Sequence, residues 1–344
     1  MTVLLRSSRA LPNPTLYSKW AVVGDTPTDL PRLSEIPDLP SRLEIAFDKV
    51  SLIWLKLGKE LSSSSSSHLA HTPSCAANIS DLGSMLAWSH LVSELAAEPE
   101  TYLVVTDDPW LYRHFSTLDN VASGQPPALW WKILKGNFRG FAARAKCSLS
   151  LMLQTLKLQS QKTLFKNNET VLLVYGHPNS TPGGEDGYFS DLLVKWPTLR
   201  RVLHVDCSAK RALELQGPND QTLSLHAWGG LFESLSLPFK KWRPSPSHMR
   251  GPFGWLVRRA AHLEGATGQA AMIAWQIMCQ RRWLECTVPH SVMWPWENHS
   301  WERQFVTAAR LFKTRTIGYQ HSVVGRQMLN YSPRSSIDDD LQCP

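Results

Sequence analysis

The 344-residue chain lacks the sequence runs that mark several common enzyme classes. It has no GxxxxGK[ST] run and no GxGxxG run after an expected strand, so the phosphate loop of nucleoside triphosphatases and the dinucleotide fingerprint are both missing. Its six cysteines form no CxxC pair and have no histidines at zinc-site spacing, which favours reduced thiols in a cytosolic protein. An Asp-x-Asp pair, typical of metal-dependent transferases, occurs only in the acidic run at 338–340. We interpret that run as solvated charge.

Long hydrophobic runs are also absent. The apolar part of the N-terminal sequence MTVLLRSSRALPNP is too short for the hydrophobic core of a signal peptide. No window reaches the roughly 18 apolar residues that a membrane-spanning helix needs. We therefore expect a cytoplasmic protein, with any membrane contact peripheral to the inner membrane.

The composition that is present suits a globular protein with phosphate-bearing partners. Hydrophobic residues make up 43% of the chain and charged residues 19%, and the length allows two α/β domains. The net charge of +7 favours phosphate-bearing ligands or an anionic membrane surface. Nucleic acid is not an expected partner, because no Lys/Arg-rich run interleaves with aromatic residues.

Apolar spacing alternates along the chain between strand-like and helix-like segments. We expect strands at 21–24, 102–105, 171–175, 201–205, 288–293 and 314–320. We expect helices at 79–97, 110–118 with Asp108 as its cap, 188–196, 269–285 and from Trp301 onward. This alternation predicts an α/β fold with Rossmann-like parallel sheets.

Two segments have a biased composition. The serine run 62–67 predicts a flexible surface loop. Residues 128–161 are rich in Lys, Arg and apolar residues and contain no acidic residue, which indicates one or two basic helices. These helices either pack across the sheet as an ordinary layer or lie against anionic lipid or a lipid-phosphate acceptor.

Residues 288–331 have the order strand, polar turn, helix, strand, polar turn. Ser300 stands where an N-cap belongs, and Glu302 lies in the first helical turn, where the helix dipole favours an anion. In a β-α-β unit, both polar turns follow the carboxyl ends of parallel strands. Open α/β sheets bind their ligands at that edge.

The two turns carry the runs WENHSWE and GYQHS, and LNY follows them. This pattern resembles the signature of a family of bacterial surface-carbohydrate (polysaccharide and O-antigen) biosynthesis proteins, in which a Tyr-Glu-Asn-x-x-Trp-Glu run precedes a Gly-Tyr-Gln-His-Ser run. Trp296 stands here in place of the family's tyrosine. The resemblance covers residues 288–331 and implies a GT-B-like glycosyltransferase architecture with two facing Rossmann-like domains. It also implies a donor cleft lined by Glu297, Asn298, Trp301, Glu302, Gln320 and His321.

Sugar transfer from a nucleotide-activated donor needs a base or carboxylate nucleophile, together with groups that hold the departing phosphate. We therefore expect catalytic roles for Glu297, His321 and Asp206. The residues expected to hold the donor are His177, Asn298, Glu302, Gln320 and Ser322. We expect no cofactor and no metal, only a nucleotide sugar as substrate and a glycan or lipid-linked acceptor.

Structural alternatives stay open for several of these residues. Glu297 and Asn298 are also suited to capping the helix, and Glu302 to neutralising its dipole. Trp301 begins the apolar helical stripe and is also suited to the core. The His177-Pro178 pair resembles a donor-nucleotide motif of some bacterial sialyltransferases.

The expected domains are an N-terminal Rossmann-like domain over residues 1–250, with a basic helical insertion near 128–161, and the start of a second such domain over 251–344. Few residues follow His321, whereas a Rossmann-like half needs on the order of 100 residues. We therefore expect the second domain to be incomplete here and the natural gene product to continue beyond Pro344.

Three functional hypotheses follow. The first is a glycosyltransferase-like protein of surface-polysaccharide synthesis. The second is a non-catalytic binding or assembly protein with a degenerate or truncated transferase fold. The third is a metal hydrolase using His290, Glu297, His299 and Glu302, although these residues form no HExxH motif.

Overall fold

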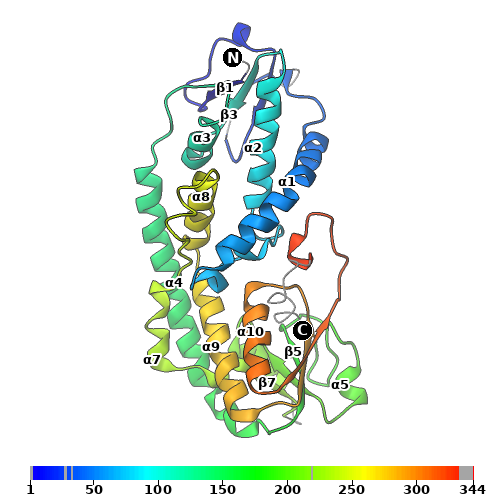
Figure 1. Ribbon diagram of the computed structural model, residues 1–344. Helices are drawn as coiled ribbons and strands as arrows, with labels where there is room; N and C mark the ends of the chain where they lie inside the picture. Colours follow the sequence, from blue (N-terminus) through cyan, green and yellow to red (C-terminus); the bar gives the residue numbers. More distant parts are fainter. Residues whose placement is uncertain (1–2, 27–28, 32–33, 218–219, 333–343) are drawn as a thin grey trace.

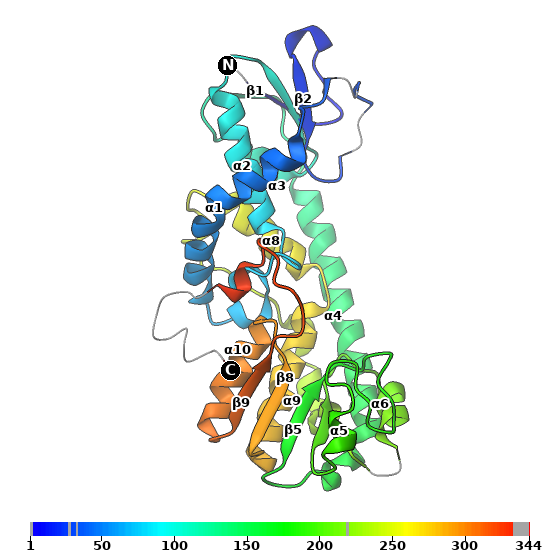
Figure 2. The same ribbon diagram turned by 90° about the vertical axis from the view of Figure 1, so that its right-hand side faces the viewer.

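The computed structural model describes residues 3–26, 29–31, 34–217, 220–332 and 344. Two sheets of parallel strands lie at opposite ends of an elongated molecule, and helix α4 (Trp130–Leu158) runs along its length between them (Figure 1). Figure 2 shows the same arrangement from the side. The α/β class and the Rossmann-like parallel sheets predicted from the alternating pattern are confirmed.

The first sheet has the strand order β2-β3-β1-β4, with all pairs parallel. Its strands are β1 (Val3–Arg6), β2 (Lys19–Val22), β3 (Tyr102–Val105) and β4 (Val121–Ser123). Helices α1 (Leu39–Ser62), α2 (Leu82–Ala97), α3 (Pro109–Phe115) and α8 (Gly254–Gly265) share a hydrophobic core with it. We call this assembly the first unit.

Helices α1 and α2 approach closely because α2 carries a glycine at the contact. Trp54 of α1 is fully buried and packs edge-on against Phe47, with 5.9 Å between ring centroids. A β-carbon at Gly83 of α2 would lie 2.2 Å from the Trp54 ring. Only glycine therefore fits this position without moving the indole.

The second sheet has the order β7-β6-β5-β8-β9, again all parallel. Its strands are β5 (Thr170–Val174), β6 (Arg200–Leu203), β7 (Thr222–Ser224), β8 (Ser291–Pro295) and β9 (Arg315–Tyr319). The accompanying helices are α5 (Leu192–Lys195), α6 (Ala209–Gln216), α7 (Leu231–Ser234), α9 (Gln269–Thr287) and α10 (Ser300–Leu311). This assembly is the second unit.

The chain enters the second sheet at β5, moves outward through β6 and β7, and returns to the other side of β5 with β8 and β9. The direction of winding therefore changes between β5 and β8. Since β5 pairs directly with β8, residues on both sides of position 250 belong to one sheet. The boundary expected between residues 250 and 251 therefore divides the second sheet between two predicted domains, whereas the strands of the two sheets separate in the chain between β4 and β5.

The chain crosses between the units more than once. After β7 it returns to the first unit, where Leu256 and Val257 of α8 join the first core. After β9 it returns again, and Leu329 of the 3-10 helix η8 (Leu329–Tyr331) is buried in that same core. An ion pair between Arg326 and Asp48 of α1 fixes this second return.

Some local predictions need correction. The helix expected at 188–196 is reduced to α5, because Asp186 Oδ1 accepts hydrogen bonds from the N–H groups of Tyr188 and Phe189 and holds a turn there. The serine run forms hydrogen-bonded turns between α1 and a 3-10 helix (Ser67–Leu69), and Ser67 Oγ donates to Ser62 O at 2.9 Å. Strands β1, β4 and β7 are additional to the predicted strands.

Candidate functional site

The carboxyl ends of four strands of the second sheet meet at one edge. Tyr175 follows β5, His204 follows β6, Glu297 lies two residues beyond β8, and His321 lies two residues beyond β9. The change of winding between β5 and β8 opens this edge between Tyr175 and Glu297. Doubly wound α/β sheets bind their ligands at such a point.

Glu297 lies between two imidazoles. Its Oε2 atom is 2.6 Å from His299 Nε2, and its Oε1 atom is 3.6 Å from His321 Nε2. The hydrogen bond from His299 and the charges of both rings together lower the pKa of the Glu297 carboxyl, against an opposing effect of burial. Glu297 is therefore ionised near neutral pH.

Glu302 organises the loop that presents Glu297. Its carboxylate is 1% exposed and accepts hydrogen bonds from Trp294 Nε1 at 3.1 Å and from the backbone N–H groups of Glu297 and Asn298 at 3.2 and 2.9 Å. Burial raises the pKa of Glu302 to about 7. The carboxylate thus shapes the turn from inside the protein.

Asn298 completes this turn in a left-handed backbone conformation, with φ of 54°. Its Nδ2 atom donates to Asn330 O at 2.6 Å, and Tyr331 Oη donates to Trp296 O at 3.2 Å. The LNY run therefore supports the WENHSWE loop directly.

Two tyrosines lie at the centre of the strand ends. The Tyr188 ring centroid is 5.3 Å from that of His321 and 5.4 Å from that of His177, and Tyr175 stacks on His204 at 4.5 Å. Burial raises the pKa of Tyr175 well above its ordinary value, and the nearby negative charges of Glu302, Asp206 and Glu297 add to the effect. Both rings are therefore neutral phenols among carboxylates and imidazoles.

A cavity of about 210 Å³ adjoins this cluster, and both units line it. His71 and Ile79 come from the first unit. The second unit and α9 supply Tyr175, His204, Val205, Asp206, Gln269, Met272, Ile273, Gln276, His299 and Trp301. Pocket-lining groups from two units are a common arrangement for a ligand site.

The imidazole of His204 has its tautomer set by Gln276. Gln276 Oε1 accepts a hydrogen bond from Val205 N at 3.0 Å, so its amide Nε2 is the group that donates to His204 Nδ1. His204 Nε2 therefore carries the hydrogen, and it has no partner among the described residues. Burial lowers the pKa of His204 to about 3, which keeps the ring neutral.

His71 is held in a similar way. The amide of Gln269 lies 2.7 Å from His71 Nε2, and His71 Nδ1 is without a partner in the described part of the chain. Burial lowers the pKa of His71 to about 3. Glu264 positions this residue by accepting its backbone N–H at 2.9 Å.

His299 has a third such nitrogen. Its Nε2 is bonded to Glu297, and its Nδ1 is unpartnered within the described ranges. His71 Nδ1, His204 Nε2 and His299 Nδ1 are thus three buried nitrogens of cavity-lining residues that have no partner in the described part of the chain. Buried polar atoms without a partner are rare in folded proteins, and three of them lie beside this one cavity.

The structure brings together some of the residues expected from the sequence and separates others. Asp206 lines the cavity and is exposed, and the surrounding protein raises its pKa by desolvation. His177 and His321 both contact Tyr188. Gln320 and Ser322 are exposed beyond β9, where Gln320 Nε2 donates to Ser322 O at 2.7 Å.

Asn298 and Glu302 are buried and bonded to the protein itself, so they position the loop. The set expected for a metal hydrolase is divided, because His290 precedes β8 whereas Glu297 follows it. Among the residues that the structure describes, no three His, Cys, Asp or Glu side chains converge as metal ligands.

Sequence reasoning missed His71, His204, Tyr175 and Gln276. His204 had a weak signal, since a histidine two residues before Asp206 at a strand end is unusual in a buried strand. His71 and Gln276 carried none, because the fold alone brings these distant segments together.

No protein-family model, curated protein or solved structure matches the chain. The functional argument therefore rests on the fold and on the geometry of this edge.

Proposed function

We propose that the protein is a glycosyltransferase-like protein of surface-polysaccharide synthesis, GT-B-like in architecture. It would transfer a sugar from a nucleotide-activated donor to a glycan or lipid-linked acceptor. One observation carries the proposal: the 210 Å³ cavity beside the winding change is lined by the exposed carboxylate of Asp206 and by three histidines, each with a ring nitrogen that has no partner in the described chain. Sugar hydroxyls and phosphate oxygens would pair these atoms.

Asp206 is the proposed base. It lines the cavity and is exposed, and its raised pKa suits a carboxylate that accepts a proton from an acceptor hydroxyl. His321 and His299 would hold the departing phosphate. Glu297 is 2.6 Å from His299 Nε2 and 3.6 Å from His321 Nε2, so it would position both rings for this role.

The proposal includes no metal, since the imidazoles and the first turn of α10 offer hydrogen-bond donors to a phosphate. EDTA is therefore expected to leave turnover unchanged. A loss of turnover with EDTA that Mg²⁺ or Mn²⁺ restores would show that a metal takes part.

Ligand protection tests the proposal first. A thermal-shift panel of UDP-, GDP-, CMP- and dTDP-sugars is expected to raise the melting temperature for at least one nucleotide class. His204→Ala should reduce that shift, because it removes one unpaired donor. A folded protein that responds to no nucleotide or nucleotide sugar would contradict the proposal.

Turnover is the second test. With the stabilising donor, Asp206→Asn and Glu297→Gln are expected to lower sugar transfer by about 10²–10⁴-fold. Asp119→Asn is the matched control, because Asp119 is exposed and lies in the first unit. Donor binding without any transfer, unchanged in these variants, would favour the binding or assembly protein instead. Asn298 and Glu302 would shape a binding loop equally well.

We also propose that the protein is cytoplasmic and contacts an anionic membrane through α4. Within the described residues, no helix combines the length and apolar character that crossing a bilayer requires. One stripe of α4 is buried against the protein, whereas its other side exposes Trp130 and Phe138 by 68% and 75%. Lys135 lies between them in the sequence, and Arg139 follows Phe138. Exposed aromatics interleaved with cations are typical of helices at anionic membrane surfaces.

Vesicle co-sedimentation tests this contact. Binding to vesicles of phosphatidylcholine with phosphatidylglycerol is expected to exceed binding to phosphatidylcholine alone, and Phe138→Ser should lower it by roughly tenfold. Leu52→Ser is the matched control, because Leu52 on α1 is 76% exposed. Equal losses in both variants would remove α4 as the contact face.

A further inference from the structure

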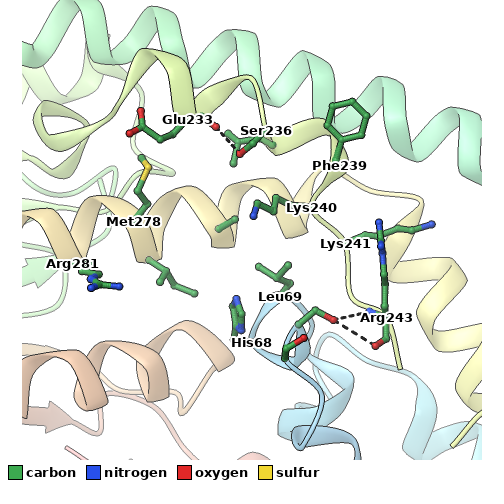
Figure 3. A pocket seen from close by; sticks show the side chains of 15 residues that line it. His68, Leu69, Glu233, Ser236, Phe239, Lys240, Lys241, Arg243, Met278 and Arg281 are labelled. Atoms are coloured by element: carbon green, nitrogen blue, oxygen red, sulfur yellow. Dashed lines mark hydrogen bonds between the residues drawn. The ribbon is translucent and has the colours of Figure 1, made fainter. Parts of the chain in front are cut away.

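A second and larger cavity, of about 700 Å³, lies on the neighbouring face of α9. Its walls come from the turn at residues 65–69 of the first unit, from residues 233–243 and from α9 (Figure 3). On α9 the lining residues Ala274, Ile277, Met278 and Arg281 follow a one-faced helical spacing. The candidate donor cavity uses the adjacent stripe that contains Gln269 and Gln276.

The floor of this cavity is aliphatic. Ala274, Ile277 and Met278 of α9 lie opposite Leu69 and Leu237, which are 6% and 3% exposed. Two of the serine hydroxyls at its edge are already engaged: Ser66 Oγ accepts from Arg243 N at 2.9 Å, and Ser236 Oγ donates to Glu233 O at 2.8 Å. The floor therefore favours an alkyl chain over a nucleotide base, which needs free polar partners.

The rim of the cavity is cationic. Lys240, Lys241 and Arg243 line it, and none of them forms an ion pair within the described residues. Burial lowers the pKa of Lys241, and the positive charges of Arg144 and Arg243 lower it further. Lys240 similarly adds to the desolvation that lowers the pKa of His68.

The carboxylate that lines this cavity already has a cationic partner. Glu233 is the one carboxylate among the lining residues, and it pairs with Arg282. Arg281 pairs with Glu285 at 2.9 Å. The three unpaired cations of the rim therefore repel one another without a local anion to balance them.

We propose that this cavity binds an amphiphilic phosphate, with its anionic head at Lys240, Lys241 and Arg243 and one aliphatic chain along Ile277 and Met278. Charge complementarity at the rim and the apolar floor together define that ligand class. A cavity of this volume accommodates a ligand of this kind. The inference does not depend on sugar transfer at the other cavity.

The position of Phe239 suggests how such a ligand would enter. Phe239 lines the cavity, is 66% exposed and packs edge-on against Phe141 of α4, with 5.7 Å between ring centroids. Phe141 is itself 44% exposed. Apolar surface therefore continues from the cavity mouth onto α4, along which a lipid chain would leave a bilayer.

Isothermal titration with dodecyl phosphate below its critical micelle concentration tests the proposal on the whole chain. We expect saturable binding of one molecule per chain. The double variant Lys240→Ala/Arg243→Ala should weaken it at least tenfold, and Met278→Asp should weaken it similarly by placing a carboxylate on the floor. Lys210→Ala on α6 is the matched control, because that lysine is 89% exposed outside the cavity.

Two further ligands test the contributions of the phosphate head and of the alkyl chain separately. Dodecanol and inorganic phosphate should each bind at least tenfold more weakly than dodecyl phosphate. Equal binding of inorganic phosphate would overturn the proposal in favour of a site for a free anion, and absence of saturable binding by dodecyl phosphate would overturn it entirely. Thermal melting of each variant shows whether it is folded, and a nucleotide-sugar shift that persists without dodecyl phosphate binding separates failure here from failure of the proposed transfer.

Discussion

The polar residues beyond the strand ends have different partners in the two sheets. In the first unit, Asp107 accepts hydrogen bonds from Ser8 N at 2.9 Å and Ser8 Oγ at 2.6 Å, and Asp108 caps α3 and pairs with Arg259 at 2.7 Å. In the second unit, Asp206 is exposed in a cavity, and His204 retains an unpaired nitrogen in the described structure. Carboxylates at strand ends thus stabilise the scaffold in one unit and are available to a ligand in the other.

The largest expected loss of stability comes from removing Arg259, the cation that pairs with Asp108 beyond the carboxyl end of β3. Arg259 pairs with Asp81 at 2.8 Å as well as with Asp108, and its side chain is 10% exposed. Arg259→Met should lower the free energy of unfolding by about 2–3 kcal/mol, since two carboxylates lose their partner and Asp81 is partly solvated. Urea denaturation measures this loss. Lys195→Met, in an exposed pair with Asp191, should change it by less than about 0.5 kcal/mol.

A second comparison lies within the WENHSWE run. Glu302→Gln should cost about 2 kcal/mol, because an amide N–H₂ group would face the N–H donors that the carboxylate now satisfies. Glu297→Gln should cost less than Glu302→Gln, because Glu297 is only half-buried and its hydrogen bond with His299 is weakened rather than lost; under the proposed function it should also impair sugar transfer. Chemical denaturation of both variants decides the point, and an equal loss in both would mean that Glu297 is also a scaffold residue.

The buried imidazoles at the candidate site predict that the stability of the fold depends on pH. His71 and His204 have folded-state pKa values of about 3, below the ordinary 6.5 of the unfolded chain. The unfolded chain therefore binds protons below pH 6.5 that the folded chain refuses, so stability is present above pH 6.5 and is lost as pH falls toward 3. Each ring contributes a slope of up to about 1.4 kcal/mol per pH unit.

Stability measured between pH 6.5 and 5 should fall less steeply in His204→Gln than in the parent protein. Glu264 and Glu302 act in the opposite direction, because their pKa values are raised to about 7 and the folded state loses stability as pH rises from 4.5 to 7. Because Glu264 and Glu302 are unchanged in both proteins, the difference between the two slopes reports the titration of His204 alone. An unchanged slope would mean that His204 is protonated in the folded protein.

The smallest expected effect is the difference in stability between the Asp107→Asn and Asp206→Asn variants. Asp107→Asn should cost up to about 1 kcal/mol, because one of its two hydrogen bonds to Ser8 is weakened. Asp206→Asn should cost nothing or stabilise the protein slightly, because desolvation by the surrounding protein already disfavours its charge. Thermal melting at pH 7 compares them, and a larger loss in Asp206→Asn would reverse the assignment of roles.

Local chemistry made part of this structure predictable. The strand at 102–105 coincides with β3 because four apolar residues are bounded by polar ones, and the predicted cap Asp108 accepts from Trp110 N and Leu111 N. The helix at 269–285 corresponds to α9 for similar reasons. Local patterns of this kind are decided within a few residues of sequence.

Other features depend on long-range packing and were not predictable. The pairing of β5 with β8 joins segments more than a hundred residues apart and moves the unit boundary away from residue 250. His71 reaches the cavity because α8 and α9 bring Glu264 and Gln269 beside it. Sequence alone also could not show that Glu302 is turned inward while Asp206 is accessible.

The η8 segment has a mechanical consequence. Leu329 is anchored in the core of the first unit, whereas the next two residues are bonded to the backbone of the loop that bears Glu297. Any hinge motion that separates the units would therefore pull on this loop and alter the spacing of Glu297 from its imidazoles as the gap widens. Leu329, Asn330 and Tyr331 therefore couple the separation of the two units to the position of the Glu297 carboxylate.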